Sequence, residues 1–351
     1  MTASTKATAE NPVTASTAGV LRREEFDRHV RLTRRPPAPQ AARWVENQWS
    51  LAWDLPAGRT FSSQVLAHPT CSLTVELGSH PRGELPRGET VVVTGVATRR
   101  FDVRACGWSR VVGLRFRPGG LAALTGRSAA DWTNRTLPAR DVLDAELCDA
   151  LADPGLSVLP DQWASVAQAG LATAAARGTV DTRYDDLLDV IADMLTDRSL
   201  ITVAEVAHRH GVTVRTLQRL FTHYVGVGPK WVLARYRMHD VITEMHDGYD
   251  GTLTDLAHRY GWFDQAHFTR DFTALVGVPP GQYRDESLPP RPAAASGGPQ
   301  PEPSAASPQP GPSAASPQGA TARPRPASGP QGRDCEGSDR PRGPDVSRSG
   351  T

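Results

Sequence analysis

Two segments of the chain repeat one another almost position by position. Residues 203–211 read VAEVAHRHG and residues 253–261 read LTDLAHRYG, so apolar, acidic, alanine, histidine, arginine and glycine positions recur in the same order. After a turn that is slightly longer in the second copy, TLQRLFTHYVGVGP is echoed by HFTRDFTALVGVPP. Duplication over about thirty residues is hard to produce by chance. The chain is therefore expected to build the same small unit twice.

Each copy has the spacing of a helix-turn-helix unit. In the first helix, apolar residues at i, i+3 and i+4 form one buried face, and they are Val203, Val206 and Ala207, or Leu253, Leu256 and Ala257. Gly211 and Gly261 follow, where glycine readily takes the positive φ that ends a helix. Thr213 and Asp264 are N-caps for a second helix. Its apolar face is predicted to be Leu217, Leu220, Phe221 and Tyr224 in the first copy and Phe268, Phe272 and Leu275 in the second.

The opposite face of the second helix is polar in both copies and suits a major groove. Arginine can hydrogen-bond two acceptors of guanine, glutamine can pair with adenine, and alanine or a threonine methyl can touch the thymine methyl. These residues could instead only solvate an amphipathic helix, but the same outward face in two copies favours DNA readout. The predicted DNA-contacting residues are Arg215, Gln218, Arg219 and Thr222, then Gln265, Ala266, Thr269 and Arg270, with the helix caps Thr213 and Asp264 near phosphate.

The segment between the copies is predicted to be one helix. PKWVLARYRMHDVITEMHDG begins with proline, which suits a first helical turn. A helix of about 18 residues is about 27 Å long and could hold two recognition helices about 34 Å, one DNA turn, apart. One chain would then read two adjacent major-groove segments in an asymmetric site. The predicted apolar stripe is Ala234, Met238, Val241, Ile242 and Met245.

The net charge does not indicate a nucleic-acid partner. The whole chain has a formal net charge of +1, and basic and acidic residues are equal in number over 199–285. Because non-specific affinity for DNA comes from neutralised phosphates, we expect a modest salt dependence and weak non-specific binding. Specific contacts would have to supply more of the affinity.

The rest of the chain divides by composition. Short β-branched and aromatic runs separated by Pro and Gly fill about 40–117 and predict a small barrel or sandwich, whereas about 119–197 reads as helices. The fold class is therefore α+β and multidomain, with an N-terminal small β-barrel or cupin-like domain with helices and a C-terminal all-α domain. The predicted parts are a disordered tail at 1–20, a β-rich sensing or dimerisation domain at 21–175, a DNA-binding domain at 176–287 and a disordered Pro/Ser/Ala/Gly-rich tail at 288–351.

The duplicated region resembles the AraC/XylS family of bacterial regulators. TVAEVAHRHGVTVRTLQRLFTHYVGVGPKWVLARYRMHDV is similar to the family's first helix-turn-helix and linker helix, and GWFDQAHFTRDFTALVGVPPGQYR to its second motif, over about 199–285. The resemblance implies an all-α domain that binds double-stranded DNA at promoters, usually as an activator that touches RNA polymerase. The family's base-contacting positions fall on Arg215, Gln218 and Arg219, and on Gln265, Ala266, Thr269 and Arg270.

The N-terminal part carries a second resemblance. WVENQWSLAWDLPAG, followed by RVVGLRFRPGG, resembles the uncharacterised cupin-like domain of one branch of that family. Such domains sense a small-molecule effector, form a homodimer, or both. Four tryptophans could line a ligand cavity, although core packing is the favoured role, and they are Trp44, Trp49, Trp53 and Trp108.

Other classes of function are less favoured. A DNA-repair methyl acceptor would need a cluster of reactive cysteines, and no two of the four cysteines form a CxxC pair. An interaction module whose helix-turn-helix units no longer read DNA stays open. His208, His210 and His258 are interpreted as surface or packing residues, so we expect no metal. We also expect no enzyme and no cofactor. The start of the chain is small and polar and no run reaches the roughly 18 apolar residues of a membrane span, which predicts a cytoplasmic protein with no membrane partner.

Overall fold

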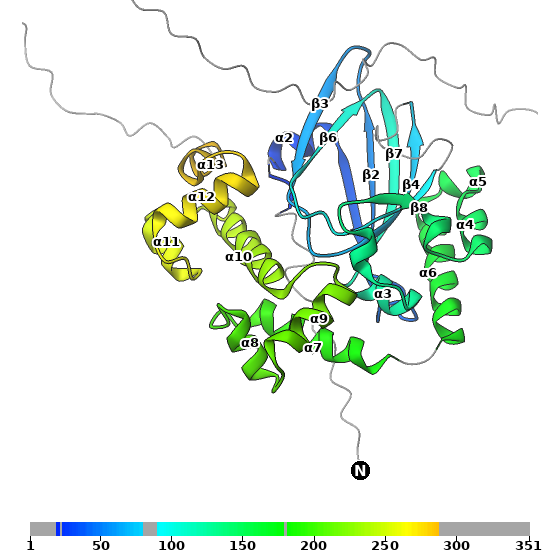
Figure 1. Ribbon diagram of the computed structural model, residues 1–351. Helices are drawn as coiled ribbons and strands as arrows, with labels where there is room; N and C mark the ends of the chain where they lie inside the picture. The colour runs from blue at the N-terminus through cyan, green and yellow to red at the C-terminus, as the bar shows by residue number, and fades with distance from the viewer. Residues whose placement is uncertain (1–18, 22, 80–89, 179–180, 288–351) are drawn as a thin grey trace, which may run out of the picture.

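Two antiparallel sheets face one another in the N-terminal part of the computed structural model, which describes residues 19–21, 23–79, 90–178 and 181–287 (Figure 1). The larger sheet has the order β1-β2-β7-β4-β5-β8 and the smaller pairs β3 with β6. Their bounds are β1 Arg31–Arg35, β2 Val45–Asp54, β3 Thr60–Val65, β4 Ser72–Gly78, β5 Val91–Thr94, β6 Phe101–Cys106, β7 Trp108–Phe116 and β8 Thr136–Pro138. Among these described strands no ladder joins the two sheets, so of the expected barrel or sandwich the structure has the sandwich.

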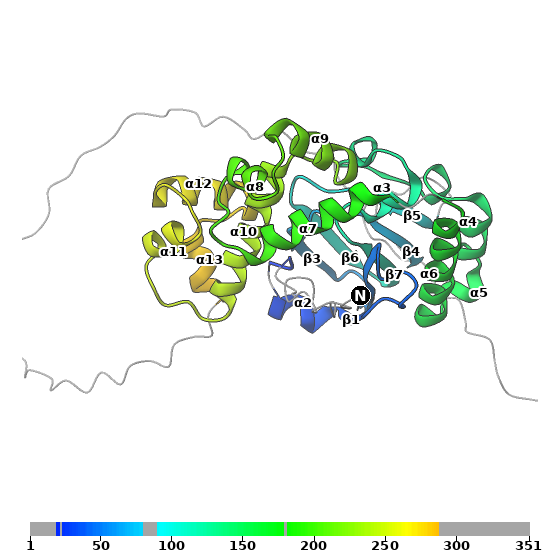
Figure 2. The same cartoon turned by 90° about the horizontal axis from the view of Figure 1, so that it is seen from below.

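Helices cover one face of the larger sheet (Figure 2). The alternation of strand residues explains this arrangement, because Val75, Val112 and Leu114 point to one side and are buried there among helix side chains. A polar contact fixes α6 on this face, where Gln168 Nε2 donates to Gln48 Oε1 at 3.0 Å. The helices of this part are α2 Arg23–His29, α3 Gly120–Thr125, α4 Ala145–Leu151, α5 Pro154–Ser157 and α6 Pro160–Arg177, with short 3-10 turns at η1 Ala129–Trp132 and η2 Ala139–Asp141.

The C-terminal part is helical and confirms the duplicated unit. Helices α8 and α9 form the first helix-turn-helix, α11 and α12 form the second, and α10 joins them. The α13 helix and the α2, β1 and β8 elements were not predicted from the sequence. The bounds are α7 Thr182–Thr196, α8 Val203–Arg209, α9 Val214–Tyr224, α10 Pro229–His246, α11 Leu253–Arg259, α12 Gln265–Val276 and α13 Pro280–Ser287.

Repeated side chains anchor the first helix of each unit. Thr202 and Glu205 form a reciprocal capping box at the start of α8, and Thr252 accepts a hydrogen bond from the Asp255 backbone in the same place on α11. The repeated arginines tie each unit to the preceding helix. Arg209 pairs with Asp197, just after α7, at 2.5 Å, and Arg259 pairs with Glu244 on α10. These repeat positions are structural.

Two hydrophobic cores divide the C-terminal part unequally. The first unit shares one continuous core with the larger sheet, α3, α6 and α7. The second unit has its own core, which also takes in Leu21 and Leu66 from the N-terminal part. Helix α10 contributes to both cores. It is buried on more than the predicted stripe, because Arg235, Tyr236 and His239 are also buried.

Glycine at the turn of each unit supplies a testable difference. Gly211 has φ +64° with open space around it, whereas Gly261 has φ +78° and a Cβ there would lie 2.5 Å from Ile201 Cγ2. Because positive φ costs an L-residue about 1–2 kcal/mol, Gly211→Ala should lower the free energy of unfolding by about 1 kcal/mol. Gly261→Ala should cost more, since Ile201 must also move. Urea denaturation of both variants measures this, and an unchanged Gly211→Ala midpoint would contradict it.

Candidate DNA interface and ligand cavity

The first recognition helix, α9, presents the predicted residues to solvent. Thr213 Oγ1 accepts a hydrogen bond from the Thr216 backbone at 3.1 Å and so caps the helix as predicted. Leu217, Phe221 and Tyr224 are buried, and Leu220 is half-buried. The structure brings the four predicted DNA-contacting side chains together on the exposed side, and they are Arg215, Gln218, Arg219 and Thr222.

The second recognition helix, α12, repeats the arrangement with two differences. Asp264 Oδ1 accepts from the His267 backbone at 2.6 Å and caps the helix. Val276 takes the buried position predicted for Leu275, which is half-buried. Gln265 Oε1 also accepts a hydrogen bond from Thr254 Oγ1 at 2.7 Å, so its amide oxygen is held by α11. Of the predicted contacts, Gln265, Ala266 and Arg270 are exposed and Thr269 is half-buried.

Sequence reasoning missed one exposed aromatic residue at this surface. Phe263 directly precedes the cap of α12 and is 87% exposed. Its neighbour Trp262 fills the core instead and donates a hydrogen bond from Nε1 to Asp271 Oδ2 at 2.9 Å. The only sequence signal for Phe263 is a difference between the two copies, because the shorter turn of the first copy has no aromatic residue.

The N-terminal part contacts the helix-turn-helix units away from their recognition faces. Arg100 Nη1 donates to the Val276 carbonyl at 2.5 Å, at the C-terminal end of α12. Thr133 Oγ1 donates to the Gly226 carbonyl at 2.9 Å, just after α9. On α10, Arg235 Nη2 donates to the Thr98 carbonyl at 2.9 Å. Both recognition faces therefore stay accessible while the domains are docked.

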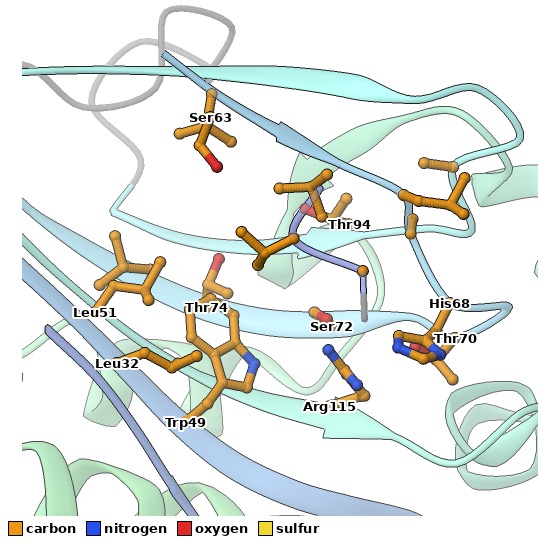
Figure 3. Close-up of a pocket in the computed structure, with 18 of the residues that line it drawn as sticks. Leu32, Trp49, Leu51, Ser63, His68, Thr70, Ser72, Thr74, Thr94 and Arg115 are labelled. Carbon is orange, nitrogen blue, oxygen red and sulfur yellow. The ribbon is translucent and has the colours of Figure 1, made fainter. Parts of the chain in front are cut away.

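A cavity of about 190 Å³ lies between the two sheets (Figure 3). Its wall on the larger sheet comes from the face opposite the helices and includes Trp49, Leu51 and Arg115. The sequence favours core packing as the role of the four tryptophans. Trp49 and Trp53 line this cavity instead. The cavity is mostly apolar with a few polar groups, which is typical of a small-molecule site.

One end of the cavity touches the linker helix. His68, which lines the cavity, stacks on His239 of α10 with ring centroids 4.0 Å apart and planes 4° apart. Burial lowers the pKa of both imidazoles, to about 3 for His239, and the charges of Arg115 and Arg235 lower them further. Both rings are therefore neutral near pH 7. Two neutral rings can stack in contact where two imidazolium ions would repel.

The described ranges give little support to a metal site, a reactive thiol or a membrane-spanning helix. No group of three His, Cys, Asp or Glu side chains suited to a metal ion occurs there, and His208 and His258 are exposed on the surface. Cys71 is buried, and burial raises the pKa of its thiol to about 12, so it is not a reactive thiolate at neutral pH. None of the helices in the described residues has the length and apolar character to cross a membrane.

Known proteins match the two parts of the chain separately. Residues 206–286 match the family described as "Helix-turn-helix domain", and residues 33–138 match a "Domain of unknown function (DUF6597)". A "Putative AraC-like transcription regulator" of Streptomyces lividans is 33% identical over 89 residues, 25% of this chain and 29% of that protein. One of the same name from Streptomyces antibioticus is 32% identical over 88 residues, again 29% of its length.

Solved structures resemble the chain more distantly. A transcriptional regulator with an AraC-type DNA-binding domain from Chromobacterium violaceum is 19% identical, with a TM-score of 0.28, over 30% of this chain and 95% of that one. Unsaturated fatty acid bound ToxT from Vibrio cholerae is 15% identical, with a TM-score of 0.32, over 68% of this chain and 94% of that one.

The fold and the exposed recognition helices define a tandem helix-turn-helix domain of the DNA-binding class. Over this domain the chain is similar to AraC-like transcription regulators, and the domain follows a region that matches a domain of unknown function.

The stacked histidines predict a pH-dependent stability. In the unfolded chain a histidine titrates near pH 6.5, whereas His68 and His239 have lowered pKa values in the folded protein. The unfolded state therefore binds more protons below about pH 6.5, and the stability present above that pH falls as the pH falls through it. Urea denaturation at pH 7.5 and 5.5 should show this loss. His239→Phe keeps a flat ring and should flatten the dependence, with His208→Phe as the exposed control; an unchanged slope in His239→Phe would count against it.

Proposed function

We propose that this protein is a sequence-specific DNA-binding transcription regulator that reads two adjacent major-groove segments with one chain. The observation that carries the proposal is the duplicated recognition helix. In α9 and α12 a capped helix buries its apolar side and exposes arginine and glutamine on the other. Those side chains match the hydrogen-bonding groups of the major groove. The names of the relatives point the same way.

The spacing of the two units supports reading by one chain. Helix α10 has 18 residues, about 27 Å of helix, which suits recognition helices about one DNA turn apart. Tyr260 also holds the second unit to its surroundings, because Arg198, in the loop before α8, lies over its ring at 5.2 Å and its hydroxyl donates to Glu244 of α10 at 2.5 Å. These contacts favour a fixed geometry over two independently mobile units.

The N-terminal domain completes the proposal as the regulatory part. Its cavity, with the contacts to α10 described above, suits a small-molecule effector that alters how the DNA-binding units are held. Activation of a promoter through RNA polymerase, and a homodimer formed by the N-terminal domain, follow from the AraC/XylS resemblance and belong to the same proposal. The protein would act in the cytoplasm, without catalytic activity.

An interaction module with non-reading helices is the alternative. The equal numbers of acidic and basic residues over 199–285 are its main support. Footprinting of the full chain on genomic DNA separates the two, since a module that does not read DNA gives no sequence-selective protection.

The outward arginines should carry separate parts of the specificity. Arg219→Ala and Arg270→Ala should each weaken specific binding by about 1–3 kcal/mol, and each should relax selectivity at a different end of one site. Binding to randomised DNA, followed by sequencing of the bound fraction, measures both effects. Arg177→Ala, at the exposed end of α6, controls for the loss of one charge. If both variants lost affinity equally on every sequence, the arginines would be phosphate contacts.

Phe263 should contribute to DNA binding and not to stability. Because the side chain is 87% exposed, Phe263→Ala should leave the free energy of unfolding within about 0.5 kcal/mol of that of the unsubstituted protein. Removal of an aromatic face beside the cap of α12 should weaken binding to the specific site several-fold, as measured by fluorescence anisotropy. Unchanged affinity would show that Phe263 lies outside the interface.

A further inference from the structure

The cavity between the sheets has an uneven distribution of charge. Among the described residues, its lining includes two arginines, Arg34 and Arg115, and no acidic side chain. Its remaining polar groups are mainly hydroxyls, such as those of Ser72 and Thr74. An anionic group would therefore meet two positive charges and several hydrogen-bond donors there, whereas a cationic group would meet repulsion.

Arg115 has unused hydrogen-bonding capacity at this site. The residue lies on β7 opposite Ser72 of β4, and Figure 3 shows its side chain among the residues around the cavity. Its Nη1 atom is buried and has no hydrogen-bond partner among the residues that the structure describes. Burial lowers its pKa, and the charge of Glu46 acts against that shift. A buried guanidinium with an unmet donor is costly, and a carboxylate has the paired oxygens that match its geometry.

The same wall of the cavity becomes apolar away from Arg115, where it is shaped by a glycine. A Cβ at Gly113 would lie 2.7 Å from Cζ2 of Trp49, so the indole can lie against the sheet only because position 113 has no side chain. Leu51 and Val111 extend the same apolar wall. An engineered apolar cavity of about 150 Å³ accommodates benzene, so a cavity of about 190 Å³ holds one ring or a short chain with a small headgroup.

We propose that this cavity binds a small apolar monocarboxylate, with the carboxylate on Arg115 and the apolar body against Trp49 and Leu51. The proposal rests on the proposed function only in treating this ligand as the effector; binding itself does not require DNA. The ligand supplies the missing acceptor for Nη1 and covers apolar wall that otherwise faces an open space.

Occupancy is transmitted to α10 through His68. This ring lines the cavity on one side and stacks on His239 of α10 on the other. A carboxylate beside Arg115 lies on the same side of the cavity as His68, because the Arg115 charge acts on that imidazole. A ligand that fills the cavity limits the movement of His68 and thereby favours the docked position of α10.

Calorimetric titration of the full-length protein with three matched probes tests the ligand class. The probes are 3-phenylpropionate, 3-phenylpropanol and 3-phenylpropylamine, which share a body and differ in charge. The acid should bind at least about tenfold more tightly than the alcohol, and the amine should not bind measurably. Equal binding of acid and alcohol by the unsubstituted protein, or no binding of the acid, would overturn the proposal without any variant.

Two variants on the same strand locate the charge. Arg115→Met replaces the buried charge with an apolar side chain of similar length, which buried sites tolerate well, and should remove the preference for acid over alcohol. Arg110→Met changes an exposed arginine of β7 and should leave that preference intact. If both variants kept the preference, the carboxylate would not lie on Arg115.

Hydrogen exchange with and without 3-phenylpropionate tests the link to α10. Amides of Pro229–His246 should exchange several-fold more slowly with the acid bound, and His68→Ala should reduce that protection while binding persists. Binding without a change in α10 would overturn the transmission step. Footprinting of the same protein without ligand reports on DNA recognition separately, so a failure of the ligand proposal and a failure of the DNA proposal are distinguishable.

Discussion

The burial of α10 from several sides is the constraint on which the rest of the structure depends. A linker between two DNA-binding units could be a solvated helix with one apolar stripe. Here Met238, Val241 and Ile242 enter the core of the second unit, whereas Val232, Leu233 and Tyr236 join the core shared with the sheet domain. Because one rigid helix belongs to both cores, the units cannot change their relative position without disturbing the packing of the N-terminal domain.

The sequence predicted the duplicated units well because their signals are local. Helix caps, a glycine at each turn and apolar spacing within each helix determined α8, α9, α11 and α12 almost to the residue. The short elements β1 and β8 could not be predicted because their signals are not local. The β1 strand reads RLTRR, with no apolar alternation, and β8 ends in a proline, so both depend on pairing with strands distant in the sequence.

The candidate sites divide in the same way. Exposed recognition residues could be predicted because a polar helix face is visible in the sequence. Arg235 and His239 of α10, and Arg115 in the cavity, could not, because polar residues are usually at the surface. Only tertiary contacts reveal that Arg235, His239 and the Nη1 atom of Arg115 are buried. Phe263 shows the converse, since an aromatic residue between a core tryptophan and a helix cap is expected to be buried and is not.

One hydrogen bond joins segments from the two ends of the described chain. Tyr283 of α13 donates to the carbonyl of Leu21 at 2.7 Å, and Leu21 belongs to the core of the second helix-turn-helix unit. A ribosome adds about 5–20 residues per second, so Leu21 is synthesised roughly 13 to 50 seconds before Tyr283. The segment around Leu21 therefore lacks its hydrogen bond to Tyr283 until nearly the whole of the folded chain has been synthesised.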